Sequence, residues 1–148
     1  MALDRLGTTA VLETVRLVEA LAEEWTAHPP AQLRAGGLGV RDLRRTAREL
    51  GVDEPTVALL AEVAAAAGLL NATHGPQPVY LPTPEFDVWR RQDPAPRWAE
   101  LAGAWLEMTR QPSLVSQRSD RDRVITALSP DAERGTMPAL RARVLDLL

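Results

Sequence analysis

Residues 33–82 read LRAGGLGVRDLRRTARELGVDEPTVALLAEVAAAAGLLNATHGPQPVYLP, and this stretch decides the fold. Apolar residues recur every three or four positions over 40–50, a spacing that predicts an amphipathic helix. Gly51 suits the left-handed position that ends a helix, and Asp53 suits the cap of the helix that follows. The expected buried stripe of the first helix is Val40, Leu43, Ala47 and Leu50.

The next segment, about residues 54–67, is almost wholly apolar, with Glu62 as its only charge beyond the first turn. A helix that is apolar all round is normally buried on more than one side. Two short apolar runs, 69–73 and 78–81, then bracket a Gly/Pro turn at 74–77, which predicts a hairpin. Two helices followed by a hairpin are the order of a winged helix-turn-helix.

The other segments predict further helices. An amphipathic pattern covers residues 9–27, Thr8 or Thr9 can cap that helix, and His28-Pro29-Pro30 stops it. Helices are also predicted over 83–92, 97–110 and 138–148, with a rigid joint at 93–96 and an exposed polar loop at 111–123. The expected fold class is mainly α: a winged helix-turn-helix with a small β-hairpin wing, followed by a helical extension. We expect a winged-helix domain over 1–82 and an extension packing on it over 83–148, truncated from a longer chain.

Composition excludes several classes of function. The net charge is −3 over 148 residues, and all 17 basic residues are arginine. A protein coated for nonspecific nucleic-acid binding is usually basic overall. The absence of Cys excludes disulfides, thiolate zinc sites and thiol nucleophiles. Neither a secretory signal nor a run of about 20 apolar residues is present, so we expect a cytoplasmic protein without membrane contact.

The arginines of the first predicted helix form the candidate binding site. Their spacing brings guanidinium groups together on one helix surface, where they could hold nucleic-acid phosphates. Two alternatives stay open: a solvated face partly neutralised by Asp42 and Glu49, or a surface that recognises an acidic protein. The candidate nucleic-acid-binding residues are Arg41, Arg44, Arg45 and Arg48.

The second helix lacks the side chains that read bases. Direct readout in the major groove needs Arg, Lys, Asn or Gln near the start of this helix. The chain offers Asp53, Glu54, Thr56 and Ala58 there instead, and the hairpin tip at 74–77 has no arginine. Sequence-specific reading by this helix is therefore not expected.

Candidate catalytic and cofactor chemistry is weak throughout. The loop Gly36–Gly39 opens a helix but lacks the Lys of a nucleotide-binding loop, so it is interpreted as a tight turn. His28 and His74 stand far apart, and the four tryptophans lie on apolar stripes that indicate core packing. The carboxylate pairs Glu23/Glu24 and Asp120/Asp122 lie on solvent-facing segments. We expect no enzyme activity, catalytic residue, metal, cofactor or small-molecule substrate.

Four pieces of the chain carry a resemblance to a known family. They are LRAGGLGVRDLRRTARELGV, AAAAGLL, LPTPEFDVW and RWAELAGAWL, which belong to residues 33–52, 64–70, 81–89 and 97–106. Together they resemble the central region of actinobacterial helicase-associated proteins of the XPB/Ssl2-like helicase family. The resemblance implies a winged-helix accessory region of a larger multidomain protein and transfers no catalytic residue.

The expected function is a non-catalytic accessory module of a helicase-like protein. Its partners would be neighbouring domains of the same polypeptide and DNA, contacted through phosphates by the arginine-rich helix. The alternative is a protein-protein or interdomain docking module that binds no nucleic acid.

Overall fold

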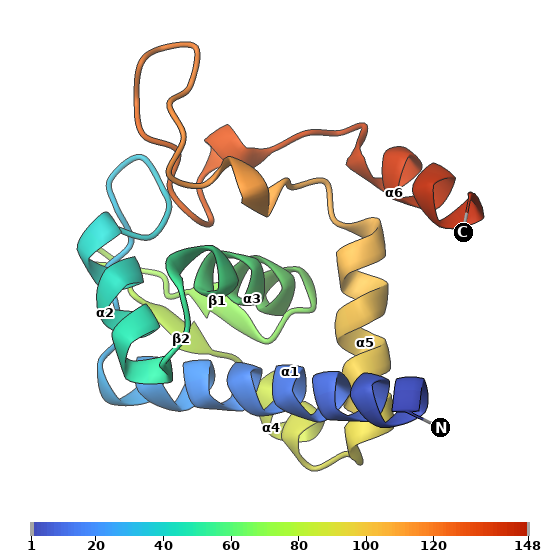
Figure 1. The fold of residues 1–148 in the computed structure, drawn as a ribbon. Coiled ribbons are helices and arrows are strands. Elements are labelled where there is room, and N and C mark those ends of the chain that lie inside the picture. The colour runs from blue at the N-terminus through green and yellow to red at the C-terminus, as the bar shows by residue number, and fades with distance from the viewer. Residues whose placement is uncertain (1, 148) are drawn as a thin grey trace.

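The computed structural model describes residues 2–147, which form six α-helices and one small antiparallel hairpin (Figure 1). The prediction of a mainly helical domain is confirmed. The helices are α1 (Ala2–Ala27), α2 (Val40–Leu50), α3 (Glu54–Ala66), α4 (Pro84–Arg90), α5 (Pro94–Glu107) and α6 (Met137–Asp146). The hairpin consists of β1 (Leu70–Ala72) and β2 (Tyr80–Pro82), and two 3-10 turns are η1 (Pro112–Leu114) and η2 (Pro130–Ala132).

Helix α3 is the centre of the molecule, and its neighbours are α1, α2, α5 and η1 (Figure 1). Its small residues explain this position, because Ala58, Ala61 and Ala64 are all completely buried and let neighbouring elements approach closely. The exposed residues of α3 lie mainly near its two ends and at Leu59. The expectation that this helix is buried on more than one side is confirmed.

Trp25 anchors α1 to this core. Its side chain is completely buried, and its indole nitrogen donates a hydrogen bond of 3.0 Å to the Thr46 hydroxyl on α2. The Tyr80 ring lies 5.9 Å from the Trp25 ring, centroid to centroid. A buried indole N–H needs such a partner, since an unpaired donor in the core is costly. One side chain thus joins α1, α2 and the hairpin.

The hairpin is short and follows α3 directly. Leu70 pairs with Pro82 and Ala72 with Tyr80 in antiparallel register. The Tyr80 hydroxyl accepts a hydrogen bond of 3.1 Å from the backbone nitrogen of Gly37, so the hairpin also fixes the loop ahead of α2.

Three predicted boundaries were wrong, one of them the end of α5, which lies at Glu107 and not at residue 110. Helix α1 begins at Ala2, seven residues before the predicted start, so Thr8 and Thr9 lie inside it and do not cap it. The predicted rigid joint at 93–96 is the first turn of α5, in which Asp93 is the N-cap residue and Pro94 the first helical residue. Proline is tolerated there because the first amides of a helix have no partner within the helix.

Residues 108–136 cross over α3 without forming a long helix. A bridge joins Arg110 to Glu133, and Leu38 donates a backbone hydrogen bond of 2.8 Å to the carbonyl of Ala127. This segment therefore covers the end of the core next to the loop that precedes α2. Helix α6 then lies beside the C-terminal part of α5 (Figure 1).

Candidate functional site

The arginines of α2 lie on the side of that helix which faces away from the core. Leu43, Thr46 and Ala47 are buried and fix the inward face, as the spacing predicted for Leu43 and Ala47. Val40, predicted to belong to the buried stripe, is instead 36% exposed. Gly51 ends the helix with φ 69° and ψ 32°, the left-handed geometry that glycine adopts without strain. The exposed arginines are Arg41, Arg44 and Arg48.

The four arginines differ in what they contact. Arg44 approaches Glu54 of α3, with 3.8 Å between Nε and the carboxylate. Arg45 is half-buried, lies 3.3 Å from the Asp42 carboxylate and donates to the carbonyl of His28 at 3.2 Å. Within the described part of the chain, the side chains of Arg41 and Arg48 have no hydrogen bond or ion pair. The structure therefore leaves three arginines accessible and ties the fourth to the fold.

The start of α3 is occupied by its own hydrogen bonds. The Asp53 carboxylate accepts a bond of 3.0 Å from the backbone nitrogen of Thr56, as predicted for an N-cap. Hydrogen bonds from the Thr56 hydroxyl and then its backbone nitrogen lower the pKa of Asp53. Helix α3 is also packed against α1, α2 and α5, so little of its surface beyond Pro55, Leu59 and Ala66 is exposed.

Glu62, the charge in the middle of α3, is completely buried and forms the centre of an ion network. Its carboxylate accepts hydrogen bonds from Arg110 and from the backbone nitrogen of Leu128. Arg110 also binds Glu133 at 2.9 Å and the carbonyl of Ser129. A buried charge with this many partners indicates a structural role, namely holding residues 108–136 on α3.

Desolvation lowers the pKa of the Arg110 guanidinium, but this effect is outweighed by Glu62 and Glu133. Their hydrogen bonds and negative charges together raise the pKa above its ordinary value. Arg110 is therefore charged at neutral pH. A permanently charged guanidinium cannot exchange a proton with a substrate, so Arg110 offers no acid-base chemistry.

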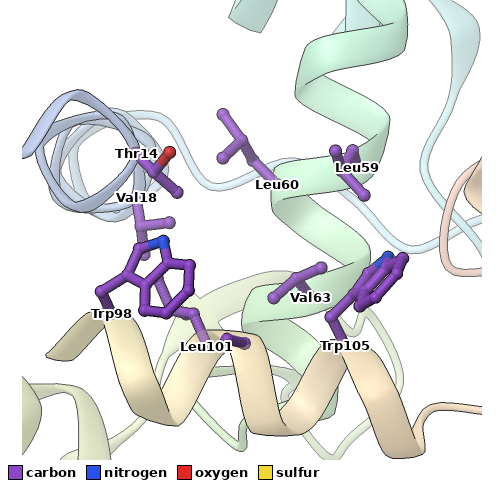
Figure 2. A pocket seen from close by; sticks show the side chains of 9 residues that line it. Thr14, Val18, Leu59, Leu60, Val63, Trp98, Leu101 and Trp105 are labelled. Carbon is purple, nitrogen blue, oxygen red and sulfur yellow. The ribbon is translucent and has the colours of Figure 1, made fainter. Parts of the chain in front are cut away.

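An apolar groove runs between α1, α3 and α5 (Figure 2). Its volume is about 260 Å³. Figure 2 shows Trp98 and Trp105 on α5, with Val63 of α3 between them and Leu59 further along α3. Trp98 is 41% exposed, so the prediction that all four tryptophans are core residues is wrong for this one. The complete lining is Thr14, Val18, Leu59, Leu60, Val63, Trp98, Leu101, Ala102 and Trp105, none of which is charged.

The remaining sequence candidates are not brought together. His28, the residue after α1, lies 3.3 Å from the Glu24 carboxylate, whereas His74 lies in the exposed turn of the hairpin. Residues 2–147 contain no group of three or more His, Cys, Asp or Glu that could hold a metal ion. Asp122 pairs with Arg118 at 3.5 Å, and Glu23 is exposed on α1. The described residues thus show no clustered acid-base or metal chemistry.

The glycine loop before α2 is a tight turn. Gly36 and Gly37 have φ values of 88° and 101°, which disfavour any side chain. A Cβ atom at Gly37 would lie 2.4 Å from the Thr126 hydroxyl and 3.0 Å from the carbonyl of Ala127. The glycines therefore let residues 126–130 pack against the start of α2.

That packing brings together basic residues which the sequence did not connect. The polar segment at 111–123 was expected to be an exposed loop, but its first part is η1, which packs on α3. Its exposed later part carries Arg118, Arg121 and Arg123. In the structure it lies at the same end of the molecule as the beginning of α2 (Figure 1). Arg and Asp alternate in this segment, so its sequence does not stand out as basic.

Comparison of this chain with models of protein families, with curated proteins and with solved structures found no match. The resemblance to helicase-associated proteins stays a prediction. None of the helices over residues 2–147 is both long enough and apolar enough to span a membrane.

Proposed function

We propose that this chain is a non-catalytic module that holds nucleic acid through its backbone phosphates, using Arg41, Arg44 and Arg48 of α2. The observation that carries the proposal is that all three side chains are exposed. Those of Arg41 and Arg48 also make no hydrogen bond or ion pair with the other described residues. A guanidinium group donates several hydrogen bonds in a fixed fork that matches phosphate oxygens. Exposed arginines on one helix surface can therefore contact successive phosphates.

A winged helix-turn-helix is part of this proposal. The order of α2, a short turn, α3 and a hairpin supports it, and so does the left-handed Gly51 between the helices. In such a module the first helix commonly crosses the backbone of the duplex, which is the role we assign to α2. Following the family resemblance, we place the module in a larger helicase-like protein.

The proposed binding is independent of base sequence. Phosphate contacts fix position and orientation, whereas base contacts supply specificity. Helix α3 is buried, Asp53 caps it, and Glu54 lies beside Arg44. The module would therefore bind many sequences with similar affinity. A net charge of −3 agrees with a localised contact rather than a generally basic surface.

The test is titration of a labelled DNA duplex by fluorescence anisotropy over a range of salt concentrations. A triple variant, Arg41→Ala, Arg44→Ala and Arg48→Ala, should bind more weakly at every salt concentration. Each lost phosphate contact should reduce the slope of log affinity against log salt by about 0.9. The control variant Arg16→Ala, Arg91→Ala and Arg143→Ala removes the same charge from exposed positions on α1, after α4 and on α6.

Equal losses in the two triple variants would show that only net charge matters and would overturn the proposal. Absence of binding at low salt, where charges are least screened, would overturn it as well. A poly-glutamate peptide serves as a parallel probe of an acidic protein surface. Binding of that peptide without binding of DNA would replace the nucleic-acid function by docking to an acidic protein.

A second candidate function, protein docking, is favoured by the apolar groove. We assign the groove to α6 of a second copy, together with the residue that follows this helix. Leu140 and Val144 of α6 and Leu147 directly after it are 47%, 50% and 87% exposed. Residues at these spacings share one helix face over two turns, about 10.5 Å. Trp98 and Trp105 have the same seven-residue separation on α5. An uncharged groove matches an uncharged stripe, because burying an unpaired charge is costly.

Sedimentation velocity at increasing protein concentration tests this second function. A dimer that dissociates in the single variants Val144→Glu and Leu59→Glu would support it, since both positions are exposed in one copy. A monomer at every concentration would remove it.

A further inference from the structure

Residues 116–125 form an arm that projects from the body of the molecule (Figure 1). A bridge pairs Arg118 with Val124. The backbone nitrogen of Ser116 donates to the carbonyl of Ile125, and that of Ile125 donates to the carbonyl of Gln117, both at 2.8 Å. Ile125 is 2% exposed and fixes the base of the arm in the core. The arm is therefore an ordered hairpin-like structure with a defined position, not a free loop.

A polar pocket of about 400 Å³ lies between the arm and residues 130–134. Four of its lining residues are arginines and two are aspartates, so its formal charge is positive. Arg123 lies 3.7 Å from the Asp131 carboxylate, which leaves much of its guanidinium available. The side chain of Arg121 is exposed and makes no hydrogen bond or ion pair with the other described residues. The charged lining residues are Arg118, Asp120, Arg121, Arg123, Asp131 and Arg134.

The backbone connects this pocket to α2. Pro130 lines the pocket, and its ring lies 3.4 Å from the position that a Cβ atom at Gly36 would take. Leu38, two residues before α2, is hydrogen-bonded to Ala127. Arg41 lies in the first turn of α2, at the end nearest to the arm. The arm and the first turn of α2, which contains Arg41, therefore lie at the same end of the molecule.

We infer that this arm pocket is a second phosphate site, which holds a phosphodiester group of the same nucleic acid that α2 contacts. The inference rests on the proposed function and deepens it. Several guanidinium groups around one opening suit a phosphate, which accepts several charge-assisted hydrogen bonds at once. Two contact points on separate elements would fix the direction of the nucleic acid across this end, which a single helix cannot do.

The test is the single variant Arg121→Glu, with Arg143→Glu as its matched control. Both arginines are exposed, and Arg143 lies on α6, in its last turn. In the DNA titration, Arg121→Glu should reduce affinity about tenfold at low salt and reduce the salt slope by about 0.9. Arg143→Glu should change affinity less than about twofold. Unchanged circular dichroism and thermal melting would show that both variants are folded.

The variant Arg48→Glu separates this inference from the function on which it rests. If Arg48→Glu weakens DNA binding and Arg121→Glu does not, the arm inference is overturned and the α2 function stands. If neither variant weakens binding more than Arg143→Glu does, both are overturned. Inorganic phosphate is titrated in parallel by calorimetry. Phosphate binding that Arg121→Glu abolishes without any effect on DNA binding would identify a site for free phosphate, which also overturns the inference.

Discussion

Arginine has two different environments in this molecule. Arg110, in the segment 108–136, and Arg141, on α6, both have partners for their guanidinium groups. Arg110 binds Glu62 and Glu133, and Arg141 donates to two backbone carbonyls. Arg41 and Arg48 lie on the outer face of α2 and have no such partner among the described residues. The first pair holds the fold together, and the second pair is available to a ligand.

The difference comes from the partner rather than from the arginine itself. A buried guanidinium is stable only where carboxylates or carbonyls replace the water that it loses. Each of these partners comes from a distant part of the chain; Glu62, for example, is 48 residues from Arg110. An exposed guanidinium keeps its water and exchanges it for phosphate at little cost. Substitutions in the two environments should therefore have opposite consequences.

The largest effect should follow Arg110→Ala. This change leaves the completely buried Glu62 carboxylate without its guanidinium, and removal of one member of a buried pair costs about 3–5 kcal/mol of unfolding free energy. Urea denaturation monitored by tryptophan fluorescence measures the loss.

Arg48→Ala is the matched control, and it should change the unfolding free energy by less than about 0.5 kcal/mol. The double variant Glu62→Leu and Arg110→Met removes both charges and should recover most of the stability lost in Arg110→Ala. If Arg110→Ala and Arg48→Ala cost the same, the distinction between buried and exposed arginines does not hold.

A smaller effect is expected for Arg141→Ala. Arg141 is 5% exposed, donates to the carbonyls of Met108 and Arg110, and lies 5.1 Å from the centre of the Trp105 ring. Desolvation lowers its pKa, but the guanidinium remains charged. Losing its hydrogen bonds should cost about 1.5–3 kcal/mol.

Hydrogen exchange locates this effect. The amides of α6 should exchange faster in Arg141→Ala, whereas those of α2 should keep their rates. Arg143, two residues further along the same helix, is exposed, and Arg143→Ala should leave both helices unaffected. Faster exchange in α2 as well would mean that Arg141 stabilises the whole fold rather than the position of α6.

The smallest effect concerns pH. The hydrogen bond from the Thr109 hydroxyl, followed by the bond and charge of Arg110, lowers the pKa of Glu133. Since the folded pKa is below the unfolded value of about 4.3, Glu133 stabilises the fold above that pH. This contribution disappears as the pH falls through the folded pKa. The variant Glu133→Gln should be slightly less stable at neutral pH, and the difference should close in acid.

Thermal melting between pH 3 and pH 7 measures this difference. The effect should be small because the Glu133 side chain is 49% exposed and water screens the ion pair. A difference that grows as the pH falls would have the wrong sign and would contradict the assigned cause.

Local sequence signals determined most of the helices and the hairpin. Apolar periodicity gave α2 its correct bounds, Asp53 was correctly expected to cap α3, and Gly51 has the predicted left-handed geometry. Helix bounds and caps depend on residues that are neighbours in the sequence, so a short stretch of chain is enough to predict them. Proline is a more ambiguous signal, since a residue such as Pro94 can end one element or begin the next.

The candidate site was predicted only in part. The α2 arginines were identified from spacing, but their division into exposed Arg41, Arg44 and Arg48 and half-buried Arg45 depends on His28, which α1 brings into reach. Trp98 lies on a helical stripe that resembles a core stripe, and only the packing of α5 against α1 and α3 leaves it at the edge of a groove.

By itself, the sequence determined that the chain is mainly helical, the bounds of α2, and that α3 must be covered, because these properties follow from local geometry and hydrophobic burial. Only the tertiary structure decided what covers α3, that Arg110 neutralises Glu62, and that the arm lies at the same end as α2. Those contacts join residues far apart in the chain. These contacts depend on the packing of the whole molecule, so no local sequence pattern predicts them.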